Sequence, residues 1–165
     1  MFDLKPISKE AIPQALEKAQ HYRLLNDPLA AESICLDVLD VDSENQAALI
    51  TLILALADRL AGGYILGAAR ARDLLPRVKD NYQRAYYCGI ICERQAYAVL
   101  HQGGPGSRVD AYEWLRDAME CYQEAETIRP HGNDDSILRW NTCVRIIKNN
   151  NLEPRSVEVF EPYLE

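Results

Sequence analysis

Residues 118–130 read AMECYQEAETIRP, and this stretch decides the fold that we expect. Ala118, Tyr122 and Ala125 follow one another at the spacing of one face of an α-helix. The proline that closes the stretch cannot continue a helix, so it marks the end of this one. An earlier stretch, AESICLDVLDVDS at residues 31–43, carries small or apolar residues at the same offsets. The chain therefore repeats a helix with one closely packing face.

Helical spacing of apolar residues runs through most of the chain, and sustained alternation with a period of two is absent before the last fourteen residues. Turn-forming and helix-breaking residues separate each helical stretch from the next. We expect seven helices, at residues 8–25, 28–41, 46–60, 66–79, 81–102, 109–128 and 134–149. Pro76 lies inside the fourth and should either kink it or end its regular part near Leu75. The sequence therefore predicts an all-α fold.

The repeated pattern resembles the tetratricopeptide repeat (TPR), a helix–turn–helix unit of about 34 residues. In that family small residues let two helices approach, and an aromatic residue fills the gap to the next hairpin. The resemblance implies about three antiparallel hairpins, stacked as a right-handed superhelix and followed by a capping helix, in a domain of residues 1–151. The interval from Ala31 to Ala118 is 87 residues, where two repeats would give about 68. The array is therefore divergent, and a closed helical bundle is the structural alternative.

Composition and charge argue against several classes of protein. The 165 residues include 18 Lys and Arg against 25 Asp and Glu, a net charge of −7. This balance argues against a nucleic-acid binder, which needs a basic face for the phosphates. No apolar run approaches the roughly 20 residues that cross a bilayer, so we expect no membrane insertion. The N-terminus shows no signal-peptide core, and five cysteines do not suit a disulfide framework, so we expect a cytoplasmic protein.

No pattern of glycines, cysteines or histidines predicts catalysis or a cofactor. The glycine-rich loop at residues 103–107 follows a helix and lacks the lysine of a phosphate-binding loop. Cys88 and Cys92 share a helical face that Cys121 can oppose from the next helix, and three thiolates could begin a zinc site. The CxxC spacing and the histidine of common zinc sites are missing, so we favour packing in the core. We expect no catalytic residue, no metal and no cofactor.

The resemblance also implies where a ligand binds. TPR proteins bind a peptide or a helix in a concave groove lined by the first helix of each hairpin. In this chain the groove would draw on mostly apolar and aromatic residues with two arginines, a composition typical of binding hot spots: Leu16, Gln20, Arg23, Ile50, Thr51, Leu54, Tyr86, Tyr87, Ile90 and Arg94.

Some TPR proteins hold the carboxylate tail of heat-shock chaperones with a clamp of Lys and Asn. Leu16, Gln20 and Thr51 stand at the matching places here, so that clamp is not built. A partner should therefore be anchored by apolar side chains. We predict a non-catalytic adaptor or chaperone-like module that binds another protein or peptide.

Residues 152–165 form a separate acidic and apolar tail, which we expect to be extended. Its apolar side chains, among them Val157, Phe160 and Leu164, are many for a free end, and such segments usually dock on another surface. We expect the tail to pack into the groove, onto the basic fourth helix or against the last helix, in its own chain or in a neighbouring one. Exchange between chains would make a homodimer. The alternative function is therefore a structural homo-oligomer whose groove holds its own tail.

Charges are segregated along the chain. Residues 27–45 hold six acidic side chains and no basic one, whereas a basic cluster follows in and after the fourth helix: Arg70, Arg72, Arg77, Lys79 and Arg84. We expect neighbouring helices to complement each other electrostatically. A basic docking patch for an acidic peptide is the alternative.

Overall fold

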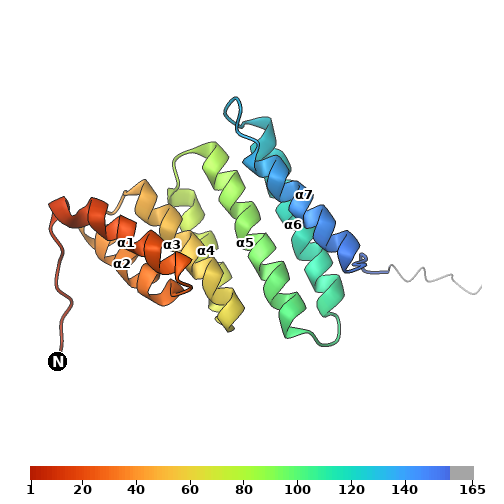
Figure 1. The fold of residues 1–165 in the computed structure, drawn as a ribbon, viewed down its shortest axis with the longest axis horizontal. Coiled ribbons are helices and arrows are strands. Elements are labelled where there is room, and N and C mark those ends of the chain that lie inside the picture. The colour runs from red at the N-terminus through yellow and green to blue at the C-terminus, as the bar shows by residue number, and fades with distance from the viewer. Residues whose placement is uncertain (157–165) are drawn as a thin grey trace, which may run out of the picture.

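The computed structural model describes residues 1–156, and α-helices dominate them (Figure 1). They hold seven α-helices: α1 (Ile12–Leu24), α2 (Pro28–Val41), α3 (Gln46–Asp58), α4 (Leu66–Leu74), α5 (Asn81–Gln102), α6 (Ser107–Thr127) and α7 (Asp135–Asn149). Short 3-10 segments precede α1 and follow α3 and α4, at η1 (Lys9–Ala11), η2 (Arg59–Gly62) and η3 (Leu75–Arg77). No strand occurs between residues 1 and 156. The all-α prediction is confirmed.

Local chemistry explains where the helices begin and end. Asp27, Asn45 and Asp80 each accept a hydrogen bond from the backbone N–H three residues further on, which caps α2, α3 and α5. Pro76 ends α4 as expected, because the chain leaves the α-helix at Leu74 and passes through η3. α6 begins two residues earlier than predicted, directly after Gly106, whose positive φ of 79° suits glycine.

The helices lie in a row, with α1 and α2 at one end and α6 and α7 at the other (Figure 1). Helices that are consecutive in the chain pack together as α1 with α2, α3 with α4 and α5 with α6, and α7 packs on α6. α3 also contacts both α1 and α5. The first helices of the three pairs therefore follow one another across the molecule.

Two clusters of buried apolar side chains form the core. The first draws on α1 to α4 together with Ile91 of α5, and the second draws on α5 to α7, with Leu54 of α3 packed against it. The small and apolar residues at the repeated offsets of α2 and α6 belong to the core. Their side chains are fully buried: Ala31, Cys35, Val38, Ala118, Tyr122 and Ala125. In α1, Ala19 is fully buried but Tyr22, three residues later on the same stripe, is 37% exposed. The packing face is thus well defined in α2 and α6 and weaker in α1.

A glycine allows α5 and α6 to approach closely. A Cβ atom added at Gly89 of α5 would lie 2.3 Å from Cε1 of the Tyr122 ring, which is far inside van der Waals contact. The ring of Tyr122 therefore rests directly on the α5 backbone. The pair shows why a small residue faces an aromatic one across this hairpin.

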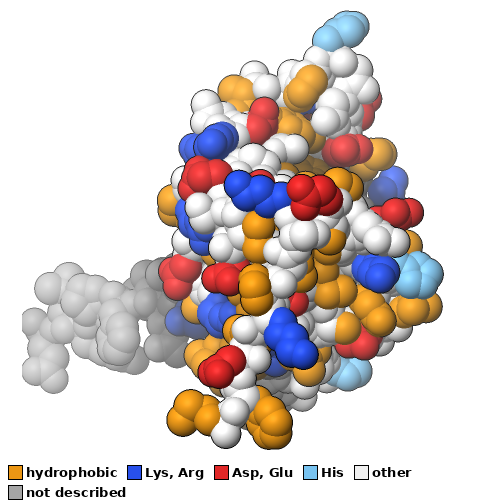
Figure 2. All heavy atoms as spheres, turned by 90° about the vertical axis from the view of Figure 1, so that its left-hand side faces the viewer, with side chains coloured by type: hydrophobic (Ala, Val, Ile, Leu, Met, Phe, Trp, Pro, Cys, Tyr) orange, Lys and Arg blue, Asp and Glu red, His pale blue; other side chains and the backbone are white. Residues whose placement is uncertain are grey.

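The segregated charges pair across neighbouring segments. The buried carboxylate of Glu32 on α2 accepts hydrogen bonds from Arg59 of η2 at 2.5 Å and from Arg70 of α4 at 2.7 Å. Glu44 lies 3.4 Å from the ammonium of Lys79. The expected complementarity between neighbours is confirmed at these pairs. Figure 2 views the end formed by α1 and α2, where hydrophobic side chains alternate with both signs of charge.

Alkaline pH should destabilise this fold. Burial raises the pKa of the Cys35 thiol, and that of Cys143, from the ordinary value of 9.0 to about 12. Both pKa values are raised in the folded state, so the unfolded chain loses these protons first. The thiol contribution to stability is complete below about pH 9 and is lost as the pH rises toward about 12.

Urea unfolding at about pH 8 and about pH 10.5 measures this loss. We expect a lower free energy of unfolding at the higher pH, and a smaller difference in the Cys35→Ala variant. If wild type and variant lost stability equally between the two pH values, the Cys35 thiol would play no part.

Candidate functional site

A cleft of about 640 Å³ opens between the C-terminal ends of α1 and α3 and the second half of α5. We call it the α1–α3–α5 cleft, and it is lined by Arg23, Leu24, Asn26, Ala57, Asp58, Ala61, Arg94, Tyr97, Ala98 and His101. Each of the three helices contributes to the walls. Arg23 and Arg94 belong to the ten groove residues that the sequence predicts.

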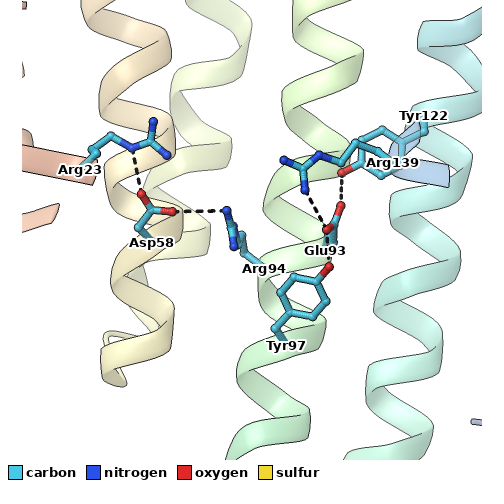
Figure 3. Close-up of polar contacts among 7 residues, drawn as sticks. All are labelled: Arg23, Asp58, Glu93, Arg94, Tyr97, Tyr122 and Arg139. Carbon is cyan, nitrogen blue, oxygen red and sulfur yellow. Dashed lines mark hydrogen bonds and ion pairs between the residues drawn. The ribbon is translucent and has the colours of Figure 1, made fainter. Parts of the chain in front are cut away.

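Asp58 of α3 lies between these two arginines (Figure 3). Its carboxylate accepts a hydrogen bond from Nε of Arg23 at 2.9 Å, and its other oxygen lies 3.8 Å from Nη2 of Arg94. The Arg23 side chain is mostly buried, whereas that of Arg94 is 36% exposed. Because two guanidinium groups share one carboxylate, the three side chains together carry a net positive charge. Arg94 is the more exposed of the two arginines.

Small and apolar side chains form much of the rest of the cleft. Ala61, which is exposed, and Ala98, which is half-buried, present only methyl groups, and this leaves room for side chains of a ligand. Leu24, at the end of α1, is 87% exposed. The cleft therefore combines apolar surface with one accessible cation, which suits a polypeptide ligand better than a small polar metabolite.

A buried network beside the cleft holds one of its walls (Figure 3). Glu93 of α5 is only 1% exposed, and its carboxylate accepts hydrogen bonds from the hydroxyl of Tyr122 at 2.6 Å, from Nη1 of Arg139 at 3.2 Å and from the hydroxyl of Tyr97. Tyr122 lies on α6 and Arg139 on α7, so the network joins three helices. Because Tyr97 also lines the cleft, the network fixes the position of that wall.

The protonation of the two tyrosines suits this role. Burial, together with the nearby Glu93 carboxylate, raises the pKa of Tyr97 and of Tyr122 above the ordinary value. Both hydroxyls therefore keep their protons at neutral pH and donate to Glu93. The buried carboxylate is satisfied by three donors, as a buried charge must be.

The other predicted groove residues divide between surface and core. Gln20 donates a hydrogen bond to the hydroxyl of Thr51 at 3.1 Å, which links α1 to α3. Thr51 and Ile90 are buried, so neither presents a surface to a ligand. The remaining predicted residues are half-buried on α1, α3 and α5: Leu16, Ile50, Leu54, Tyr86 and Tyr87. Their role in binding stays a prediction.

Sequence reasoning missed the residues nearer the C-terminal ends of the helices. Asp58, Tyr97 and His101 line the cleft and are absent from the predicted groove. One signal could have indicated Asp58, since it is the first charged residue after the apolar run at residues 47–57. The neighbouring helices α1 and α5 each carry an arginine. A single acidic residue at the end of the run therefore favours an ion pair with both of them.

A second, smaller cleft of about 280 Å³ lies between α6 and α7. Its lining is mixed, with Tyr112, Met119, Trp140, Val144 and Ile147 beside the polar Arg116, Glu120, Gln123 and Lys148. Leu152, the first residue of the predicted tail, is buried in the second core cluster. The predicted docking of the tail depends on residues 157–165 and lies outside the described residues.

Comparison of the chain with protein-family models, with curated proteins and with solved structures gave no match. Among the helices between residues 1 and 156, none has the length and apolar character that a membrane crossing requires. The functional argument therefore depends on the geometry of the α1–α3–α5 cleft.

Proposed function

We propose that this chain is a non-catalytic protein–protein interaction module, an adaptor or chaperone-like protein of the cytoplasm. In this proposal it is built from divergent TPR-like hairpins and binds a peptide or helix of a partner protein. The observation that carries the proposal is the α1–α3–α5 cleft, to which the first helix of each hairpin contributes.

The packing supports the TPR-like part of the proposal. Consecutive helices pair, and α3 contacts both α1 and α5, as the stacking of hairpins requires. The small or apolar residues of α2 and α6 are buried at the repeated offsets, as close packing between helices requires. The row in Figure 1 keeps α1 and α7 far apart, which favours stacked hairpins over a closed bundle.

The lining of the cleft indicates the chemistry of the ligand. Asp58 is engaged more closely by Arg23 than by Arg94, so Arg94 can turn toward an acidic group of a ligand. Ala61, Ala98 and the exposed Leu24 offer apolar contacts beside it. We therefore propose that the partner segment presents an acidic side chain next to apolar ones. An arginine beside an apolar pocket is a common hot spot.

Paired affinity purifications from the native host test the proposal. The full chain serves as bait beside two cleft variants, Ala61→Trp, which fills the cleft from an exposed position, and Arg94→Gln, which removes the accessible charge. Leu138→Trp, at an exposed site on α7 outside the cleft lining, is the matched control. Circular dichroism checks that all variants fold.

We expect the wild type and Leu138→Trp to capture the same partner, and Ala61→Trp to lose it. Arg94→Gln should weaken the purified complex about tenfold, which corresponds to about 1.4 kcal/mol. Equal capture by Ala61→Trp would contradict the proposal. A homodimer that Ala61→Trp disrupts, with no other partner captured, would instead favour the structural homo-oligomer.

A further inference from the structure

Three cysteines meet where α5 packs on α6. Cys88 and Cys92 lie one turn apart on α5, Cys121 faces them from α6, and their Sγ atoms all lie within 4.8 Å of one another. All three are free thiols, with 2.7 Å between the sulfurs of Cys88 and Cys121. Cys92 is buried, while Cys88 and Cys121 are half-exposed, so the cluster has an outer side. None of the three lines the α1–α3–α5 cleft.

The spacing of the sulfurs suits a single metal ion. A zinc ion lies about 2.3 Å from each thiolate sulfur, which places ligand sulfurs about 4 Å apart in trigonal or tetrahedral coordination. The separations in the cluster range from 2.7 Å, between Cys88 and Cys121, to no more than 4.8 Å, and these limits lie on either side of this value. Cys88 and Cys121 would have to move apart by about 1 Å. Both side chains are half-buried and lie on the outer side of the cluster.

Arg72 of α4 supplies a second, independent observation. Its Nη2 is buried and has no hydrogen-bond partner within residues 1–156, and its guanidinium stacks at 4.8 Å over the ring of Trp114. The Arg72 guanidinium lies close enough to Cys88 and Cys92 for its charge to act on both thiols. Arg72 is therefore a half-buried cation beside the thiol cluster, and its buried Nη2 has no hydrogen-bond partner among residues 1–156.

The charges of a filled site would balance. Three thiolates and one divalent ion carry a net charge of −1, and the guanidinium of Arg72 offsets it. Thiolates prefer soft cations, and the charge-assisted donor of Arg72 can stabilise a metal-bound sulfur.

We propose that Cys88, Cys92 and Cys121 bind one soft divalent ion of the zinc class through three thiolates, with Arg72 as the counter-charge and a fourth position open to a ligand from solvent. This revises the expectation that these cysteines only pack in the core. A bound ion links α5 to α6 within the hairpin that also carries Tyr97 and Glu93.

The test uses the full chain, reduced and freed of metal with a chelator. Cd²⁺ is the probe, because its bonds to thiolates give a charge-transfer absorption in the ultraviolet. We expect one equivalent of Cd²⁺ per chain, and competition by Zn²⁺ for the same site. Each of Cys88→Ala, Cys92→Ala and Cys121→Ala should weaken binding at least about tenfold, while Cys35→Ala, in the other core cluster, should leave it unchanged.

Two further measurements keep the proposal testable even if a cysteine variant fails to fold. In the wild type, Cd²⁺ should shield Cys88 and Cys121 from alkylation, as mapped by mass spectrometry. Arg72→Gln keeps every ligand and should weaken binding about threefold to tenfold. The proposal is overturned if the reduced wild type takes up no Cd²⁺, if Cys121→Ala binds it as tightly, or if air joins Cys88 to Cys121 in a chain that binds no metal when reduced.

Discussion

Replacing Glu93 with alanine is expected to lower the free energy of unfolding by about 3 kcal/mol. The carboxylate is the common acceptor for Tyr97, Tyr122 and Arg139. Without it the hydroxyl of Tyr122, on a fully buried side chain, has lost its acceptor, and the Arg139 guanidinium has lost its only counter-charge among the described ion pairs. Glu93→Gln keeps the shape without the charge and should cost less, about 1–2 kcal/mol.

Chemical denaturation of both variants measures these losses. Glu120→Ala on α6 is the matched control, because this glutamate is 71% exposed and lies 3.9 Å from Arg116. An exposed ion pair contributes little, so we expect a change below about 1 kcal/mol. If Glu93→Ala were as mild as the control, the network would not hold α5, α6 and α7 together.

Gly89→Ala should destabilise the fold by about 2 kcal/mol, although alanine is the better helix former. The added methyl group gains up to about 1 kcal/mol in helix propensity. It must nevertheless occupy a place 2.3 Å from Cε1 and 2.6 Å from Cδ1 of the buried Tyr122 ring. Relieving that overlap displaces either the ring or the whole of α6, and overpacking of this kind typically costs 1–3 kcal/mol or more.

A double-mutant cycle separates the overlap from other effects. In a Tyr122→Leu background the ring is gone, so Gly89→Ala should become neutral or stabilising. Gly62→Ala is the control for glycine itself, since a Cβ there meets nothing within 4 Å. Equal losses from Gly89→Ala in both backgrounds would refute the direct contact between Gly89 and Tyr122.

The sequence predicts helices well where their ends depend on local groups. The bounds of α2 and α5 agree with the predicted ranges, because capping Asp27 and Asp80 mark the starts and the turns that follow mark the ends. Prediction is less accurate at α3, whose last predicted residues adopt a 3-10 helix. The two helix types share their residue preferences, so composition does not separate them.

The candidate site is harder to predict, because its key contacts join distant residues. The resemblance to TPR proteins implies that Arg23 and Arg94 line a groove, but the bridging role of Asp58 depends on how α1, α3 and α5 pack. Thr51 and Ile90 were placed in the groove and are buried. Apolar residues occur on most faces of α3, so spacing alone does not show which side faces a ligand.

The cysteine cluster illustrates the same limit. The interval of four residues places Cys88 and Cys92 on one face, and the hairpin can bring Cys121 opposite them. The sequence gives no means of seeing that Arg72, from α4, lies beside them with a donor that has no partner among residues 1–156. That single long-range contact changes the balance between a packing role and a metal-binding role.

Site-specific photo-crosslinking in the native host tests the cleft as a binding site most directly. A photoreactive amino acid replaces His101, which is exposed within the cleft, or Leu138, which is exposed on α7. We predict that position 101 forms an adduct with a partner protein, that Arg94→Gln weakens this adduct, and that position 138 forms none. A partner that co-purifies but crosslinks only from position 138 would contradict the account.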